Sequence, residues 1–144
     1  MFKQEKGVTL VALVITIIVL LILAGVSIAM LTGDNGILTK ASDSKEKNAK
    51  AQVTEDVSLA ISEIMANKAD PSYTGSENTV TAANIAKLAK ANDNSLTITA
   101  ASTTPDAEGV HKLEATLSGI TFNVTYTEKT NDAAASLDVT KKVE

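Results

Sequence analysis

The chain has 144 residues and a formal net charge of −4, from 17 acidic residues against 13 basic ones, and it contains no cysteine. The absence of cysteine excludes disulfides, thiolate metal sites and a cysteine nucleophile. No dense basic patch with interleaved aromatic residues is present, so nucleic-acid binding has little support. The hydrophobic residues are concentrated near the N-terminus, and the remainder, from Thr32 onward, is long enough for one small domain.

The most prominent feature is the apolar segment at the start of the chain. No charged side chain occurs between Val8 and Gly33, and the run from Val8 to Leu31 is interrupted only by Thr9, Thr16 and Ser27. As a helix this run would be roughly 36 Å long. A bilayer core is about 30 Å thick, so the segment is long enough to cross a membrane.

Hydropathy alone leaves the role and orientation of this segment open. A discarded secretory signal, cut near Ala24 or Ala29, is the weaker interpretation because such signals have apolar stretches of only about 7–15 residues. A permanent single-pass anchor is a further alternative. The count of basic residues does not orient the segment, because lysines lie on both sides of it. They are Lys3 and Lys6 before it, and Lys40, Lys45, Lys47 and Lys50 after it.

The residues at the junction supply more information. A short polar leader, Met-Phe-Lys-Gln-Glu-Lys-Gly, is followed at once by Val-Thr-Leu and the uninterrupted apolar run. This arrangement resembles the class III leader of type IV prepilins. The resemblance implies that a prepilin peptidase cuts on the cytoplasmic side between Gly7 and Val8, with Lys6 as the preceding basic residue. It also implies that the new amine of Val8 is methylated and that the C-terminal domain lies outside.

One position departs from the family pattern. Most pilins carry Glu at the fifth position after the Gly, where it is thought to meet the terminal amine of a neighbouring subunit, and this chain has Ala12 there. A carboxylate inside a membrane is costly and usually functional, so its absence removes an electrostatic device for assembly. Either the subunits dock without it, or the chain is a minor or tip-type subunit. Val8, where Phe or Met is common, is a smaller departure.

Two glycines and two Asx residues within 32–36 predict a break or joint after the apolar helix. The segment 37–67 lacks Gly and Pro, and its apolar residues recur at spacings of three and four, which predicts an amphipathic helix. The expected inward face contains Val53, Val57, Ala60, Ile61, Ile64 and Met65, with Ile37 and Ala41 continuing it upstream.

The remainder, 68–144, is predicted to form a small head with a short helix and three or four strands. The helix is expected from Thr81 or Ala82 to Ala91. Alternating apolar residues predict strands around Ile98, over 110–117 and over 120–127, with a further edge strand at 137–140. Ser118-Gly119 is a two-residue hairpin signal. A long helix followed by an antiparallel sheet is an α+β pattern, which is also the pilin architecture implied by the resemblance.

No residue pattern predicts an enzyme, and we expect no catalytic, cofactor or metal site. His111 is the only histidine, so it is expected to be structural or exposed. Cation loops are conceivable at 92–94 and at Asp106 and Glu108, but turn chemistry accounts for these residues and the EF-hand spacing is absent. The glycosylation sequon at Asn123 falls in a predicted strand and is discounted.

The expected function is a structural subunit of a type IV pilus-like filament or secretion pseudopilus, cleaved after Gly7 and assembled through the helix 8–31. The alternative is a single-pass, membrane-anchored surface module that does not polymerise. The resemblance implies a prepilin peptidase, an assembly ATPase, a platform membrane protein and other copies of the chain or related pilins as partners. It implies a single-pass membrane protein before assembly and a cell-surface or extracellular filament afterwards.

Overall fold

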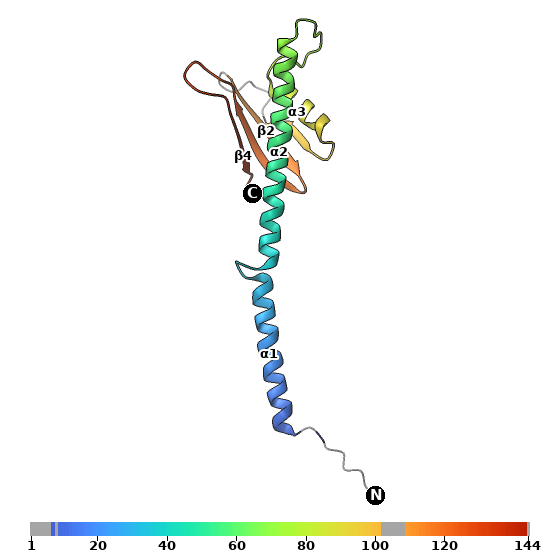
Figure 1. The fold of residues 1–144 in the computed structure, drawn as a ribbon, viewed down its shortest axis with the longest axis vertical. Coiled ribbons are helices and arrows are strands. Elements are labelled where there is room, and N and C mark those ends of the chain that lie inside the picture. Colours follow the sequence, from blue (N-terminus) through green and yellow to red (C-terminus); the bar gives the residue numbers. More distant parts are fainter. Residues whose placement is uncertain (1–6, 8, 102–108, 144) are drawn as a thin grey trace. The chain divides into compact units, whose positions relative to one another are not determined.

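The structure is a computed structural model that describes residues 7, 9–101 and 109–143. Within these residues, three helices precede or flank a four-stranded sheet (Figure 1). The helices are α1 (Leu10–Thr32), α2 (Ile37–Ala69) and α3 (Ala82–Asn92), and the strands are β1 (Thr97–Ala100), β2 (Val110–Leu117), β3 (Ile120–Thr127) and β4 (Ser136–Lys141). The predicted α+β class, a long N-terminal helical region and a small C-terminal antiparallel sheet, is confirmed. The chain divides into two compact units, 1–44 and 45–144.

The sheet is an antiparallel meander with strand order β1-β2-β3-β4. In the central pair, Leu113 lies opposite Val124 and Ala115 opposite Phe122. Because side chains alternate between the faces of a strand, this register gathers the apolar residues of β2 and β3 on one face. The expected edge strand is confirmed as β4, in which Val139 pairs with Val124.

The tight turn between β2 and β3 fixes this register. Leu117 pairs with Ile120, so the loop consists of Ser118 and Gly119 alone, and both have positive φ angles, 54° and 78°. This is the type I′ geometry that suits the twist of a hairpin. The two-residue turn expected from Ser118-Gly119 is therefore confirmed.

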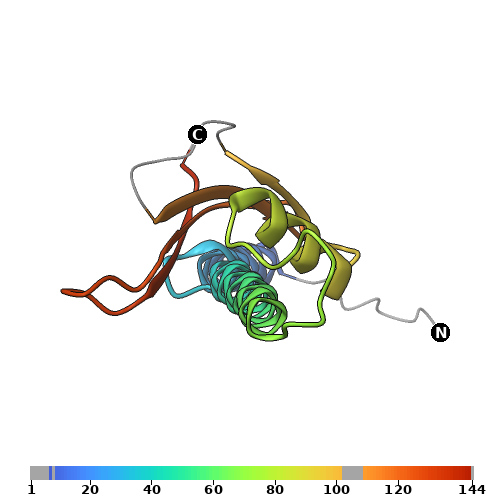
Figure 2. The same ribbon diagram turned by 90° about the horizontal axis from the view of Figure 1, so that it is seen from above.

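One hydrophobic core lies between the inner face of the sheet and the two helices α2 and α3, which lie on the same side of it (Figure 2). The largest fully buried side chains come from all of these elements: Phe122, Ile64, Ile85, Leu96, Leu113, Val53, Val57 and Val124. The outer face of the sheet carries mainly Thr, Asn and charged residues, which are exposed or half-buried.

Helix α2 contributes one stripe of buried residues, namely Ala49, Val53, Asp56, Val57, Ala60, Ile61 and Ile64. The predicted inward face is wrong at three positions, because Met65 and Ile37 are 47% and 73% exposed and Ala41 is exposed as well. Met65 lies beyond the edge of the stripe set by Ile61 and Ile64. Ile37 and Ala41 precede Lys45, where the unit that contains the sheet begins.

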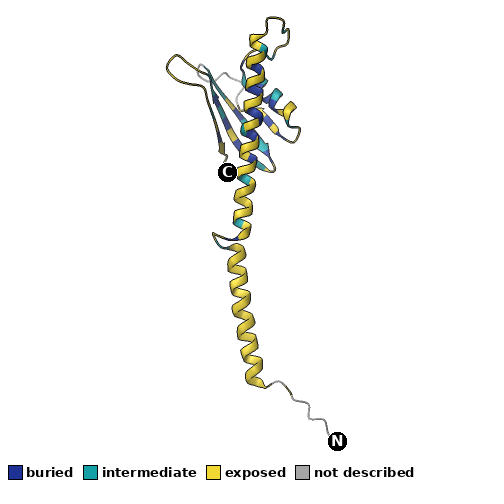
Figure 3. Cartoon of the chain, viewed as in Figure 1, coloured by how far each residue is buried: buried dark blue, intermediate teal, exposed yellow. Residues whose placement is uncertain are grey.

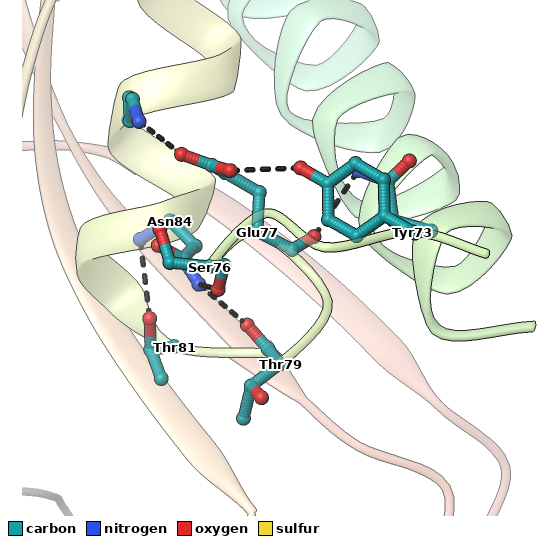
Figure 4. A network of polar contacts seen from close by, with 8 residues as sticks. Tyr73, Ser76, Glu77, Thr79, Thr81 and Asn84 are labelled. Carbon is teal, nitrogen blue, oxygen red and sulfur yellow. Dashed lines mark hydrogen bonds and ion pairs between the residues drawn. The ribbon is translucent and has the colours of Figure 1, made fainter. Parts of the chain in front are cut away.

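A polar network orders the loop between α2 and α3 (Figure 4). Glu77 is its centre, because its carboxylate accepts from the Tyr73 hydroxyl at 2.8 Å and forms an ion pair with Lys87 of α3. The side-chain amide of Asn84 donates to the carbonyls of Ser76 and Thr79. These bonds hold the loop against the N-terminal end of α3, where the Thr81 hydroxyl accepts from the Asn84 backbone N–H.

Candidate functional site

The residues around the leader junction form the first part of the candidate site. Lys6 and Val8, the expected residues before and after the cut, lie outside the described residues, whereas Gly7 is described and exposed. Among the described residues, no atom lies within 4 Å of a Cβ built on Gly7, and its φ angle is not in the left-handed region. The fold therefore has no steric or conformational need for glycine at this position.

Helix α1 begins immediately after this junction with an N-terminal cap. The Thr9 hydroxyl accepts from the Ala12 backbone N–H at 3.3 Å, and the Thr9 carbonyl accepts from the N–H of Leu13 at 3.1 Å. Threonine is a favoured N-cap residue because it satisfies an N–H that lacks an intrahelical partner. The expected family position at Ala12 is thus in the first turn of α1, where both its backbone N–H and its carbonyl are bonded within the helix.

The few hydroxyls of α1 also find acceptors within the helix. Thr16 donates to the Ala12 carbonyl at 2.5 Å, Ser27 to the Leu23 carbonyl at 2.8 Å, and Thr32 to the Ile28 carbonyl at 2.9 Å. Such bonds to the carbonyl four residues earlier are how Ser and Thr are satisfied inside helices. An apolar environment around α1 would leave none of these hydroxyls without a partner.

Every residue of the apolar helix α1 is exposed, along its whole length (Figure 3). None of its residues is buried, and large side chains such as Leu10 and Leu21 are 77% and 67% exposed. By length and composition, this segment near the N-terminus could cross a membrane. The buried core helix of a soluble protein can pass the same test, but α1 differs from such a helix because the described chain covers none of it.

The joint between α1 and α2 depends on two close backbone approaches. A Cβ on Gly33 would lie 2.7 Å from the Ala29 carbonyl oxygen, and one on Gly36 would lie 2.6 Å from that of Leu31. The Gly36 N–H donates to the Gly33 carbonyl at 2.6 Å, and the Thr39 hydroxyl donates to the same carbonyl at 3.2 Å. The break between the helices is therefore a defined, hydrogen-bonded turn at 33–36. An open, mainly apolar hollow, lined by residues that include Val26, Met30 and Ile37, borders it.

The other candidates from the sequence are placed as follows. His111 lies on β2, where its ring stacks on Tyr126 and its Nε2 is 2.8 Å from Glu128 Oε1, which is a structural setting. Asp106 and Glu108 lie outside the described residues. Asp93 caps the C-terminal end of α3, and its Oδ1 accepts from the backbone and hydroxyl of Ser95 in a local turn.

Sequence reasoning missed one polar residue of the core. Asp56 is 8% exposed, and it is the one buried charged residue among the described residues. Its position follows from the helical period, because it lies three and four residues from Val53 and Ala60 on the buried stripe of α2. The helical spacing was therefore a signal, but the residue type made a solvent-facing position the default expectation.

Comparison with protein-family models, with curated proteins and with solved structures gives no match for this chain.

Proposed function

We propose that this chain is a structural subunit of a type IV pilus-like filament or secretion pseudopilus, cut after Gly7 and assembled through α1. The observation that carries the proposal is the fully exposed apolar helix α1, which begins three residues after the Lys6-Gly7 junction. Lipid and a bundle of like helices are both apolar surroundings. The same helix can therefore move from one to the other, with packing contacts deciding the direction.

The polar groups of α1 are compatible with both surroundings. Its three hydroxyls donate within the helix, and no acidic or basic residue occurs in its first or last turn. Transfer of α1 from lipid to a helical bundle would then require no new hydrogen bond from these hydroxyls and would bury no charged side chain of the helix. Gly25 and Ala29 add a pair of small residues at the four-residue spacing that allows close approach of helices.

Ala12 distinguishes the proposed assembly from that of the family it resembles. With Ala12 in place of Glu, the first turn of α1 offers no carboxylate to the terminal amine of a neighbour. The Thr9 hydroxyl already accepts from the Ala12 N–H, so this N–H needs no acceptor from a neighbouring subunit. Subunits of this chain would then dock through apolar packing alone. Alternatively, the chain is a minor or tip subunit that docks with a related pilin carrying the carboxylate.

The first experiment is intact-mass measurement of the protein isolated from its native host. Processing predicts a chain that begins at Val8 and carries one additional methyl group, whereas a chain that still begins at Met1 would contradict the proposal. Gly7→Val is a suitable variant because Gly7 has open space around it and no strained φ angle. We expect this variant to fold normally, to keep its leader and to be absent from filaments.

The runner-up is a permanently anchored, single-pass surface module, which the exposed α1 supports equally well on its own. Shearing of cells separates the two, because a filament subunit appears in long polymers in the sheared fraction and an anchored module stays with the membrane. Filament assembly would also require the partners that the resemblance implies. These are a prepilin peptidase, an assembly ATPase, a platform membrane protein and further pilin copies.

A further inference from the structure

The joint between α1 and α2 contains the one Asn-Gly pair of the chain, Asn35-Gly36. Gly36 is buried, and a Cβ there would lie 2.6 Å from the Leu31 carbonyl oxygen and 2.8 Å from that of Gly33. Asn35 is exposed, and no described residue forms a hydrogen bond with its side chain. The packing of the joint therefore requires the glycine, whereas the carboxamide of Asn35 is accessible to solvent.

An Asn-Gly pair can react with its own backbone. The nitrogen of Gly36, once it has lost its proton to a base in solvent, can attack Cγ of Asn35 and close a succinimide ring. The new N–Cγ bond replaces the Cγ–Nδ2 bond, and the side-chain nitrogen leaves as ammonia after taking up a proton from water. Water then opens the ring at either carbonyl and yields aspartate or isoaspartate. Glycine favours the attack because it has no Cβ and gives the backbone the most rotational freedom.

The hydrogen bonds of the joint oppose this reaction while the turn is closed. The Gly36 N–H donates to the Gly33 carbonyl at 2.6 Å, so the nitrogen that must attack Asn35 is held in the turn. The Thr39 hydroxyl donates to the same carbonyl at 3.2 Å, and the Gly36 carbonyl accepts from the N–H of Lys40 at 3.1 Å. Both backbone groups of Gly36 are thus bonded. Its nitrogen can approach Cγ of Asn35 only when the turn at 33–36 opens.

A second exposed asparagine provides an internal comparison. Asn94 lies in the turn after α3, and the N–H of the next residue, Ser95, donates to Asp93 Oδ1 at 2.7 Å. Asn35 and Asn94 thus share exposure, a turn and a hydrogen-bonded N–H in the following residue, but Ser95 has a side chain and Gly36 has none. Their relative reactivity in the unfolded chain therefore measures the effect of the glycine, and the change on folding measures the effect of the turn.

We propose that Asn35 is a deamidation site gated by the joint: it is protected while the turn at 33–36 is closed and becomes aspartate or isoaspartate when the turn opens. Isoaspartate adds a methylene group to the backbone, which displaces Gly36 from its close approach to the carbonyls of Leu31 and Gly33. The reaction thus makes a reversible opening permanent. Either product also adds a carboxylate next to Asp34. The inference does not depend on whether the chain polymerises.

The test follows Asn35 in the full chain, held in detergent micelles at mildly alkaline pH with and without concentrated urea. Peptide mapping by mass spectrometry measures conversion of the amide to the acid, and chromatography separates aspartate from isoaspartate. Fast amide exchange at Gly36 verifies that urea has opened the turn. In urea we expect Asn35 to react faster than Asn94. In the folded chain the rate at Asn35 should fall by at least about tenfold, which corresponds to an opening free energy of about 1.4 kcal/mol.

Two variants separate the effect of the turn from the chemistry of the pair. Thr39→Val removes the second donor to the Gly33 carbonyl, so the turn should open more often and Asn35 should react faster in the folded chain. Gly36→Ala also loosens the turn, but its methyl group crowds the attacking nitrogen. In urea, Asn35 of this variant should therefore react more slowly than Asn35 of the unchanged protein.

Equal rates at Asn35 in the folded and the urea-treated chain would overturn the gating by the joint. A rate at Asn35 in urea no greater than the rate at Asn94 would overturn the site itself.

Discussion

Helices α1 and α2 follow one another in the chain, but they differ in how much of their apolar surface the described chain covers. α1 is apolar on every side and buries no residue within the described chain, whereas α2 buries a single stripe against the sheet and α3. A helix with one apolar face can be completed by its own domain. A helix that is apolar all round is typical of a segment that is buried on every side or spans a membrane, and the described chain buries no residue of α1.

The prediction with the largest expected effect compares replacement of a side chain by alanine in the core with the same replacement in α1. Phe122 is fully buried on β3, so Phe122→Ala should lower the free energy of unfolding of the head by about 3–5 kcal/mol. Leu21→Ala should change it very little, because Leu21 is 67% exposed. Chemical denaturation in micelles, followed by near-UV signals of the head, measures both. A comparable loss of unfolding free energy in the two variants would contradict the conclusion that the head is stabilised by its own core and not by α1.

The second prediction introduces a charge into α1. Leu21 lies near the middle of the helix, where a lysine costs about 2.5–3.5 kcal/mol of insertion free energy on the biological scale. Leu21→Lys should therefore reduce the membrane-bound fraction and abolish filaments, while the unfolding of the head is unchanged. Cell fractionation and electron microscopy test the first two outcomes. Normal filaments from this variant would show that α1 does not pass through an apolar environment.

The third prediction compares the same substitution within the joint and in α1. A Cβ at Gly36 would meet two backbone oxygens within 2.8 Å, so Gly36→Ala should destabilise the turn at 33–36 by about 1–3 kcal/mol. Gly25→Ala meets no atom within 4 Å and should stabilise the helical form of α1 by about 1 kcal/mol. Amide exchange at Gly36 and Lys40, measured in micelles, should accelerate only in the first variant.

The smallest expected effect concerns the loop network of the head and its dependence on pH. Hydrogen bonds from Lys87 and then Tyr73 lower the pKa of Glu77 to about 2, from an ordinary value of 4.5. Because the pKa is lower in the folded state, this network stabilises the head above pH 4.5, and the stabilisation is lost as the pH falls through 2. Glu77→Gln should lower the Tm at pH 7. Near pH 2 the Tm of this variant should approach that of the unchanged protein.

Two partner variants sharpen this result. Lys87→Met should produce most of the same loss at pH 7, because Lys87 is the main cause of the lowered pKa of Glu77. Tyr73→Phe should lower the Tm by a smaller amount, because the hydrogen bond from Tyr73 is the second cause of the lowered pKa. A Tm difference for Glu77→Gln that stays constant from pH 7 to pH 2 would mean that the charge of Glu77 does not stabilise the loop.

The sequence by itself determined those features that depend on local order along the chain. The length and composition of α1, the interruption at the glycines of 32–36, the alternation in β2 and β3 and the turn at Ser118-Gly119 all follow from periodicity and backbone preference. The proposed cut between Gly7 and Val8 and the atypical Ala12 also come from the sequence, through a resemblance of the leader. The structure adds that Gly7 is unconstrained by the fold.

Only the tertiary structure decided which positions of α2 are inside. Helical spacing placed Val53, Val57 and Ile64 correctly, but it could not show that Met65 is 47% exposed or that Asp56 is buried. Burial is set by where α3 and the strands end, and those limits depend on packing between segments distant in sequence. The hydrogen bond from Gln52 of α2 to Asp93 at the end of α3 is a product of that packing.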